Sequence, residues 1–503
     1  LAAAIDLARV GAPVTVIERA AAPGGKMRAL DVAGRAVEAG PTVLTLRSAF
    51  EQLFADAGAD LDDHVALTPA DRLARHVWDD ARAFDLYADR ERSLEEAGRF
   101  FGADQARRLA RFQRDGERLY KTLERSFLTA SRPGVAGLLA RIARQRPSGL
   151  TAMRPFASLW RVLSDYGLDP RLRQLYGRYA TYCGASPFEA PSTLMMIAAL
   201  EQRGVWIVEG GMSALAAALA RLAESLGVVL RYETGVERIE VRGGRACGVR
   251  LEGGEVVPAG AVLSNADPDA IRDGLLGSEA AGALAPPAGP RALSAVVWSA
   301  TGRADGLTLD HHTVAFSSDY RAEFDAIFDQ ARMPDDPTVY LCAQDRGGDR
   351  TPPATERFLI LINAPADGDR RAYSQTETDT WLARTINRLE RSGLSLTLDA
   401  VQATAPDAFA ARFPGSAGAL YGRALHGWRA AFLRPGARTR LPGLYLAGGG
   451  AHPGPGVPTS LLSGRTAARS ILADFASTPR FRPAAIAGST PTRSAKTGVS
   501  ASS

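Results

Sequence analysis

Cysteine, lysine and histidine are all scarce in this chain of 503 residues. The three cysteines, Cys183, Cys247 and Cys342, lie far apart and form no CxxC pair. A structural disulfide framework and a four-cysteine zinc site are therefore not expected. No run of about 18 apolar residues occurs either, so the sequence predicts no transmembrane helix. The hydrophobic fraction of 46% and the charged fraction of 23% are those of an ordinary globular protein.

Acidic residues are absent from one long stretch. Between Arg125 and Arg161 there are seven arginines and no Asp or Glu, within a region, 95–180, whose pattern is helical and is broken by prolines. A solvated basic face would explain this stretch, and so would a surface for anionic lipid headgroups, where each arginine is worth about 1 kcal/mol. Nucleic acid is not expected as a partner, because the stretch lacks interleaved aromatic residues and the net charge is only +5.

The first residues read as the second half of a nucleotide-binding unit. Leu1–Arg9 has the pattern of a helix, Gly11–Pro13 of a turn, and Val14–Ile17 of a buried strand that ends at Glu18. In a dinucleotide-binding unit an acidic residue follows the GxGxxG glycines by about 20 residues. We therefore expect the chain to start just after the third glycine, without the first strand and the phosphate-binding turn. The alternative is an ordinary βαβ fragment with a solvated Glu18.

The residues after Glu18 strengthen the nucleotide-binding interpretation. Gly24 and Gly25 allow a planar group or a diphosphate to approach the backbone closely, because no Cβ intervenes. Lys26 and Arg28 are cationic partners for phosphate. Gly40–Thr42 supplies a second tight turn.

Further along the chain, the pattern predicts elements of the same kind. A Gly-Gly turn at Gly243–Gly244 between two alternating stretches predicts a β-hairpin. We expect a helix over Ser213–Leu226 and strands over the ranges Val228–Tyr232, Ala261–Ser264, Thr338–Cys342 and Arg357–Ile362. Near the end, Leu444–Ala468 reads as strand, Gly-rich loop and helix, and a helix N-terminus suits an anion.

These motifs together resemble the flavin-dependent carotenoid desaturases of the bacterial phytoene desaturase type. The resemblance covers roughly residues 1–475 and rests on four segments: PGGKMR (Pro23–Arg28), TGVERI (Thr234–Ile239), LSNADP (Leu263–Pro268) and LYLAGGGAHPGPGVPTSLLSGRTAA (Leu444–Ala468). Within the family, HPGPGVP followed by LSG is closer to the hydroxycarotenoid 3,4-desaturases of purple bacteria.

The resemblance implies an α/β fold: a discontinuous, Rossmann-like FAD-binding domain with an inserted α+β substrate domain and a helical subdomain. We expect the FAD-binding domain at 1–64, 204–275 and 436–475, and the substrate domain at 65–203 and 276–435. Residues 95–180 would be its helical, membrane-facing part, and 476–503 a disordered tail. The expected FAD-binding residues are Glu18, Arg19, Gly24, Gly25, Lys26, Met27, Gly40, Pro41, Thr42, Val236, Ala266, Gly448, Gly449, Gly456, Val457 and Pro458.

The resemblance also implies a chemistry and a place in the cell. An acyclic carotenoid would lose a hydride to the flavin and then a proton, a reaction that needs orientation and a dry site more than strong acids. Such a lipid substrate implies peripheral attachment to the cytoplasmic side of a bacterial inner membrane. One alternative is a phytoene desaturase or another flavoenzyme on the same scaffold, such as an amine oxidase or a polyene isomerase or saturase. A second alternative is a non-redox escort protein that binds prenyl groups or lipids.

Few residues are candidates for a direct chemical role. His452, in the Gly/Pro loop, is the one candidate proton acceptor, although it would also serve simply to hold the loop. No metal site is expected, because His311 and His312 have no acidic or cysteine partner at helical spacing. Five further residues line either a substrate channel or a plain core: Tyr179, Tyr182, Phe188, Met195 and Met196.

Overall fold

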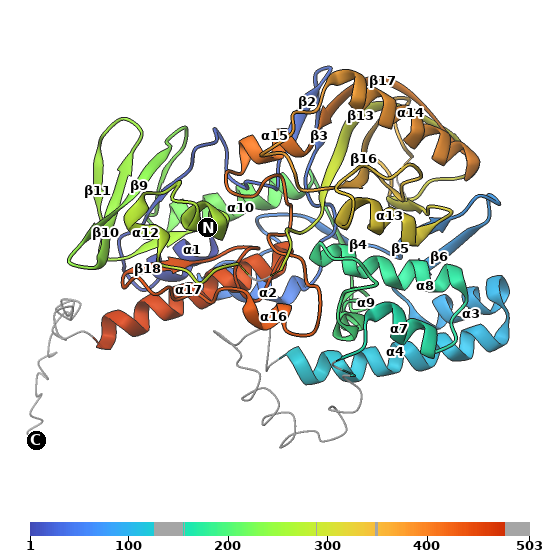
Figure 1. Cartoon of the computed structure of the whole chain (residues 1–503), viewed down its shortest axis with the longest axis horizontal. Helices are drawn as coiled ribbons and strands as arrows, with labels where there is room; N and C mark the ends of the chain where they lie inside the picture. Colours follow the sequence, from blue (N-terminus) through green and yellow to red (C-terminus); the bar gives the residue numbers. More distant parts are fainter. Residues whose placement is uncertain (125–153, 155, 288, 348–350, 478–503) are drawn as a thin grey trace, which may run out of the picture.

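The computed structural model describes residues 1–124, 154, 156–287, 289–347 and 351–477. The chain folds into mixed helix and sheet, with two parallel strand pairs on one side and a seven-stranded sheet on the other (Figure 1). Helices cover both parts. No helix in the described ranges is long and apolar enough to span a membrane.

The two parallel pairs match the expected nucleotide-binding elements. β1 (Thr15–Ile17) pairs with β8 (Val229–Arg231), and β12 (Val262–Ser264) pairs with β18 (Leu444–Leu446). Within the described ranges, no strand joins one pair to the other. The helices that pack around them are α1 (Ala2–Ala8), α2 (Arg47–Asp56), α10 (Met212–Ser225) and α17 (Val457–Ser477).

An ionic contact holds three of these helices together. Arg465 of α17 donates from Nε to Asp6 of α1 at 2.9 Å, and from Nη2 to Asp56 of α2. Asp6 is buried, and a buried carboxylate requires a partner of this kind. In Figure 1, α17 runs beside α1 at the base of this part of the molecule.

The predicted hairpin is confirmed. β9 (Val236–Arg242) and β10 (Arg245–Leu251) are antiparallel, with Arg242 opposite Arg245, and β11 (Val256–Pro258) adds a third strand. Gly243 and Gly244 have φ values of 57° and 70°, as a two-residue type I′ turn requires. Smaller antiparallel pairs are β2 (Ala29–Val32) with β3 (Arg35–Glu38), and β4 (Leu67–Pro69) with β7 (Trp206–Val208).

The seven-stranded sheet combines two segments that are distant in the sequence. Its order is β17-β13-β16-β15-β14-β5-β6, antiparallel except where β14 meets β5. The strands are β5 (Arg72–Val77), β6 (Ala83–Tyr87), β13 (Ser294–Gly306), β14 (His312–Ala315), β15 (Val339–Ala343), β16 (Glu356–Ala364) and β17 (Leu394–Thr404). The strands predicted over Thr338–Cys342 and Arg357–Ile362 are therefore β15 and β16.

The two faces of this sheet have different neighbours. Alternation along β13 places Val296 and Trp298 against α14 (Gln375–Arg391), in a core with Trp381 and Leu389. On the opposite face Val297 and its cross-strand neighbours contact Phe409 of α15 (Pro406–Arg412). The shorter helices near the sheet are α11 (Pro268–Arg272), α12 (Ser278–Ala281), α13 (Tyr320–Phe328) and α16 (Ala430–Leu433).

A layer of helices packs below the sheet in Figure 1. These elements are α3 (Arg90–Phe101), α4 (Ala103–Leu123), α7 (Leu159–Asp165), α8 (Pro170–Gly177), the 3₁₀ turns η2 (Arg178–Cys183) and η3 (Ser192–Met195), and α9 (Met196–Glu201). The helical pattern predicted for 95–180 is confirmed where that region is described. Most of the acid-free stretch, from Arg125 to Arg146, lies outside the described residues, as does the tail from 478. Arg154 and Arg161 both pair with Asp165, each at 3.0 Å.

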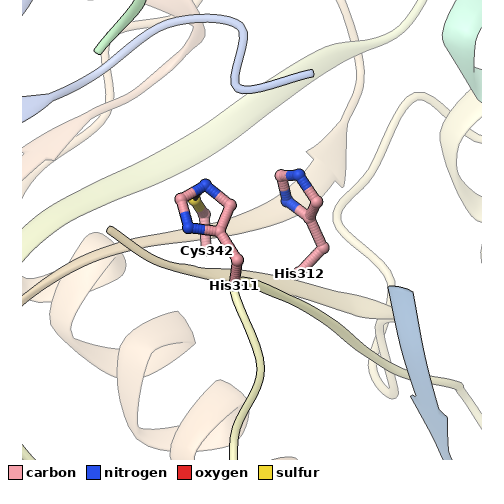
Figure 2. Close-up of side chains that lie close together, drawn as sticks. All are labelled: His311, His312 and Cys342. Carbon is pink, nitrogen blue, oxygen red and sulfur yellow. Dashed lines mark hydrogen bonds between the residues drawn. The ribbon is translucent and has the colours of Figure 1, made fainter. Parts of the chain in front are cut away.

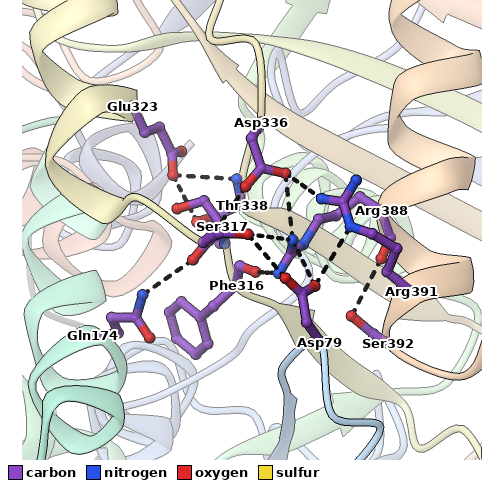
Figure 3. A network of polar contacts seen from close by, with 11 residues as sticks. Asp79, Gln174, Phe316, Ser317, Glu323, Asp336, Thr338, Arg388, Arg391 and Ser392 are labelled. Carbon is purple, nitrogen blue, oxygen red and sulfur yellow. Dashed lines mark hydrogen bonds and ion pairs between the residues drawn. The ribbon is translucent and has the colours of Figure 1, made fainter.

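A buried polar network fixes α14 to the ends of the sheet strands (Figure 3). The side chain of Arg388 is 1% exposed and lies 2.7 Å from Asp79 and 3.3 Å from Asp336, while it donates to the Phe316 carbonyl oxygen. Close by, the Glu323 carboxylate accepts hydrogen bonds from the backbone N–H and the hydroxyl of Thr338. Removing one partner from such a network would leave an uncompensated buried charge.

Candidate functional site

One large cavity of about 2270 Å³ lies between the parallel strand pairs, the inner face of the seven-stranded sheet and the helical layer. It is lined by β1 and β12 on one side and by Val297, Leu359 and Leu361 of the sheet on the other. Pockets for single small ligands measure roughly 300–1,000 Å³. This cavity therefore has room for more than one such ligand.

Every residue predicted to bind the cofactor lines this cavity. They come from three regions of the chain: the first 42 residues, the hairpin and β12 region, and the Gly-rich loop before α17. Glu18 follows the last residue of β1, where its backbone N–H donates to the Arg231 carbonyl oxygen and its carboxylate accepts from the Ala20 N–H at 2.8 Å. Three motifs that are far apart in the sequence thus meet around one space.

The glycines of the first motif face two different surroundings. A Cβ on Gly24, whose φ is +114°, would collide with the Met27 carbonyl oxygen, and one on Gly40 would collide with the Lys26 carbonyl oxygen. A Cβ on Gly25 would meet no protein atom within 4 Å. Because Gly25 lines the cavity, the space that its missing side chain leaves is available to a ligand.

Cationic side chains border the same part of the cavity. Lys26 is half-buried and donates from Nζ to the Leu420 carbonyl oxygen at 2.6 Å. Desolvation lowers its pKa to about 8, although the charge of Asp267 acts in the opposite direction. Burial also lowers the pKa of Arg28 to about 10. Arg19 donates to the Arg412 carbonyl oxygen at 2.6 Å. These groups suit an anionic ligand, which would lower the cost of burying them.

The Gly-rich loop places the start of α17 against the cavity. The Gly448 N–H donates to the Ser463 hydroxyl at 3.2 Å, and Asn265 donates to the Ala447 carbonyl oxygen at 3.0 Å. Val457 and Pro458, the first residues of α17, line the cavity. The first N–H groups of a helix lack partners within the helix, and they attract anions such as a diphosphate.

Sequence reasoning missed an arginine that holds this loop. Arg434 is buried and donates to the Gly449 carbonyl oxygen at 2.9 Å and to the Arg423 carbonyl oxygen at 2.8 Å. Its pKa is lowered by burial. No local motif marks it, because its partners lie in the folded loop rather than at a fixed sequence spacing.

The candidate proton acceptor, His452, does not line the cavity. His452 is 3% exposed and precedes a cis peptide bond to Pro453, but it is not among the residues that line the cavity. A general base must reach the proton that it removes. The catalytic role of His452 therefore stays a prediction that its position does not support.

The five channel candidates divide between the cavity and the core. Tyr182 and Met196 line the cavity, whereas Tyr179 and Met195 are each 3% exposed and, with Phe188, pack in the helical core. Beside Tyr182, two further residues that the sequence did not single out reach the cavity, namely Arg178 and Glu201. The rest of this part of the wall is largely aliphatic and aromatic.

The two adjacent histidines have a cysteine neighbour after all (Figure 2). His312 on β14 lies opposite Cys342 on β15, and the potential ligand atoms of His311, His312 and Cys342 all lie within 4.8 Å of one another. The partner comes from a neighbouring strand, so helical spacing could not reveal it.

This group has the chemistry of a zinc site but is committed to other contacts. His311 Nδ1 lies 2.6 Å from the Arg346 carbonyl oxygen, and His312 Nδ1 lies 2.6 Å from the Tyr340 hydroxyl. Burial raises the pKa of the Cys342 thiol to about 12, whereas a metal requires the thiolate. With the thiol protonated, the two histidines instead make contacts that position the Arg346 backbone and the Tyr340 side chain.

Comparison with known proteins connects this chain to flavin-dependent enzymes. The family described as flavin containing amine oxidoreductase matches residues 1–472. A hydroxyneurosporene desaturase of Rubrivivax gelatinosus is 46% identical over 99% of this chain and 96% of its own. That of Cereibacter sphaeroides is 47% identical over 95% and 97%. An all-trans-zeta-carotene desaturase of Myxococcus xanthus is 33% identical over 93% and 90%.

Solved structures support the fold alone. A putrescine oxidase structure with bound putrescine is 14% identical, with a TM-score of 0.58 over 94% of this chain and 96% of that one. An oxidoreductase of Methanosarcina mazei is 17% identical, with a TM-score of 0.56 over 94% and 97%.

Proposed function

Because the chain belongs to the flavin-containing amine oxidoreductases and, within them, to the carotenoid desaturases, we propose that it desaturates an acyclic carotenoid that carries a 1-hydroxy or methoxy group, at the 3,4 bond. FAD is its cofactor. The observation that carries the proposal is the near-complete alignment with hydroxyneurosporene desaturases, together with one cavity that collects all the predicted cofactor residues.

The described residues fit FAD, and we assign their roles as follows. The Glu18 carboxylate, at the end of β1, would hold the ribose hydroxyls of FAD. The N–H groups at the start of α17 and the glycine backbone at Gly24 and Gly25 would hold the diphosphate. We assign cofactor binding to residues 1–64, 204–275 and 436–475, and substrate binding to 65–203 and 276–435.

The reaction removes two hydrogens from neighbouring carbons. When bound, FAD supplies a two-electron acceptor that takes up the hydride. The C–H bond at one carbon breaks with both electrons, the C–H bond at its neighbour breaks as a proton leaves, and a C=C bond forms between them. The transient positive charge is spread over the polyene. The chain contributes an apolar wall that aligns the polyene and excludes water.

A pigment assay tests this function. The protein is expressed in a host that supplies either 1-hydroxyneurosporene or phytoene, and the carotenoids are separated and their spectra recorded. We expect a red shift, from the added conjugated double bond, with the hydroxylated substrate. A red shift only with phytoene would contradict the 3,4-desaturase assignment. A purified protein without flavin absorption bands would instead favour the non-redox escort alternative.

We further propose peripheral attachment to the cytoplasmic face of the inner membrane. Phe156 lines the cavity yet is 83% exposed, and its ring lies 5.7 Å from that of Trp428, which also lines the cavity. Nearby on α16, Leu433 is 48% exposed. Apolar side chains at a cavity mouth suit a substrate that arrives from a bilayer.

Flotation with vesicles tests this attachment. We expect the protein to float with vesicles of phosphatidylcholine and phosphatidylglycerol, and Phe156→Glu to reduce the floating fraction severalfold. The matched control is Val256→Glu, which replaces another exposed apolar residue, 38% exposed, on β11. Equal loss in both variants would contradict attachment through the cavity mouth.

A further inference from the structure

A polar cluster interrupts the apolar wall of the cavity; Tyr179 and Glu201 are buried in it, and Arg178 and Tyr182 are half-buried. Its centre is Tyr182, whose hydroxyl accepts a hydrogen bond from Arg178 Nη2 at 3.0 Å and donates to Glu201 Oε1 at 3.1 Å. The Tyr179 hydroxyl donates to the other oxygen of Glu201. Arg178, Tyr182 and Glu201 all line the cavity, whereas Tyr179 backs the cluster from the core.

The partial desolvation of these charged groups would be unfavourable if the cavity held only hydrocarbon. Glu201 is 5% exposed, and burial raises its pKa while the hydroxyls of Tyr179 and Tyr182 lower it. In the described part of the chain no ion pair joins Arg178 to Glu201 directly, because Tyr182 lies between them. Moving charged groups out of water is unfavourable, and a purely apolar ligand forms no hydrogen bond that would offset this.

Most N–H groups of the Arg178 guanidinium have no hydrogen-bond acceptor among the described residues. A guanidinium carries five N–H groups, and among the described residues this one makes a single hydrogen bond. Its central carbon lies 5.1 Å from the ring centroid of Tyr182 and 5.9 Å from that of Tyr340, so the guanidinium is held by two aromatic faces. The remaining N–H groups are available to an oxygen atom in the cavity.

The cluster adjoins the turn that we assign to the cofactor. The Tyr340 hydroxyl lies 2.6 Å from the Thr42 hydroxyl and 2.6 Å from His312 Nδ1, so this ring is fixed between the turn and the sheet. Arg178 therefore lies one side chain away from the Gly40–Thr42 turn. In a 1-hydroxycarotenoid the carbon that bears the oxygen is only two carbon–carbon bonds from the carbon at position 3. A group that binds this oxygen must lie close to the reacting bond, and this cluster lies close to the turn that we assign to the cofactor.

We propose that Arg178, supported by Tyr182 and Glu201, binds the oxygen substituent at the end of the carotenoid and selects oxygenated substrates over plain hydrocarbons. A hydroxyl accepts from Arg178 and donates to the Glu201 carboxylate, and a methoxy oxygen accepts from Arg178 alone. Sites that hydrogen-bond a substrate hydroxyl discriminate strongly against the analogue without it, because their own polar groups are then left unpaired. This inference rests on the proposed function and names the end group that the site recognises.

The test compares two substrates that differ by one hydroxyl. Desaturation of 1-hydroxyneurosporene and of neurosporene is measured with the FAD-loaded full chain, for the native protein and for Arg178→Met, Tyr182→Phe and Glu201→Gln. We expect Arg178→Met to lower kcat/KM for the hydroxylated substrate by about 100-fold. For neurosporene, which offers no oxygen to Arg178, we expect a much smaller change in kcat/KM, so that the ratio between the two substrates falls. The two conservative variants should shift the ratio in the same direction by a smaller factor.

Tyr166→Phe is the matched control. Its hydroxyl donates to Asp115 at 2.6 Å, a tyrosine–carboxylate pair like that of the cluster, but Tyr166 does not line the cavity. This variant should keep the native substrate ratio. Equal losses on both substrates in the three cluster variants would show a structural role and overturn the proposal, as would an unchanged ratio in all of them.

A binding measurement separates this proposal from the proposed function. The carotenoid absorption shift on transfer from detergent micelles to protein gives the affinity for each substrate without turnover. We expect the native protein to bind 1-hydroxyneurosporene more tightly than neurosporene, and Arg178→Met to bind them equally. A protein that shows this preference but desaturates neither substrate contradicts the proposed function only. Equal binding by the native protein contradicts the end-group proposal, whatever the activity.

Discussion

Three glycines of the first motif are needed for two different reasons. Gly24 and Gly40 are in contact with the protein itself, since a methyl group at either would meet a backbone carbonyl oxygen. A methyl group at Gly25 would meet no atom of the described chain within 4 Å, although the φ of +59° lies in the left-handed region. The left-handed backbone favours glycine here, and we infer that the open space beside it is used by the ligand.

This difference predicts opposite results for two alanine variants. Gly25→Ala should fold, with a cost of about 1–2 kcal/mol for the left-handed backbone, but should lose most of its bound flavin. Gly24→Ala should fail to fold stably, because a carbonyl oxygen cannot move away as a side chain can. The ratio of flavin to protein absorbance and the thermal melt of each variant provide the measurement. Full flavin occupancy in Gly25→Ala would contradict the assignment of this turn to the cofactor.

From the lowered pKa of Lys26 we expect cofactor binding to depend on pH. Burial lowers its pKa to about 8, well below that of a free lysine. An anionic ligand binds best to the protonated amine, so its binding raises this pKa. The Kd for FAD should therefore increase as pH rises above about 8, by up to tenfold per pH unit. Quenching of FAD fluorescence on binding, recorded between pH 6.5 and 9.5, gives the Kd at each pH.

Lys26→Gln provides the comparison. Its amide keeps a donor for the Leu420 carbonyl oxygen but cannot titrate. We expect weaker FAD binding that is flat across the same pH range. If the native protein and this variant have parallel pH profiles, another group causes the dependence.

Most individual elements could be predicted, because each follows from a local pattern. The Gly243–Gly244 turn and the helix α10 depend on residues that are neighbours in sequence. The pairing of β14 with β5 joins residues more than two hundred positions apart, and no local pattern encodes it. The same limit explains why Cys342 was missed as a neighbour of His312, although the register of β14 and β15 places them side by side.

The helix α13 carries a carboxyl group that makes stability depend on pH. Glu323 is 1% exposed, and burial raises its pKa to about 7 although Thr338 and Asn363 donate to it. The folded state therefore holds this proton at pH values where the unfolded state has lost it. Stability falls as pH rises from about 4.5 to 7 and then levels off, with a loss of at most about 3 kcal/mol.

Glu323→Gln should remove this loss, since an amide stays neutral throughout. Urea unfolding at pH 5, 6, 7 and 8 gives the free energy of unfolding of both proteins as a function of pH. The effects of other titrating groups cancel when the two pH profiles are compared. Glu279→Gln, on the exposed side of α12, should keep the native slope. If the free energy of unfolding of Glu323→Gln depends on pH as strongly as that of the native protein, another group causes the dependence.

At the scale of the whole molecule, the cavity is built from both parts of the chain. The predicted cofactor residues come from motifs with short spacing, and for that reason they could be found in the sequence. Arg178, Glu201 and Arg434 depend on side chains that meet only after folding, and the sequence did not reveal them. Sequence patterns thus predicted residues that line one side of the cavity, which we assign to the cofactor, while the polar cluster that we assign to the substrate emerged only from the fold.

A ligand that touches both parts should stabilise the whole chain. FAD at 100 times its Kd should add about 2.7 kcal/mol to the free energy of unfolding, because it binds the folded state alone. ADP reaches the Glu18 side but leaves the rest of the cavity empty, so at equal concentration it should raise the Tm by less. Thermal melts over a series of FAD and ADP concentrations measure both effects. Gly25→Ala should show little rise with FAD, and a native Tm that is independent of FAD concentration would contradict cofactor binding in this cavity.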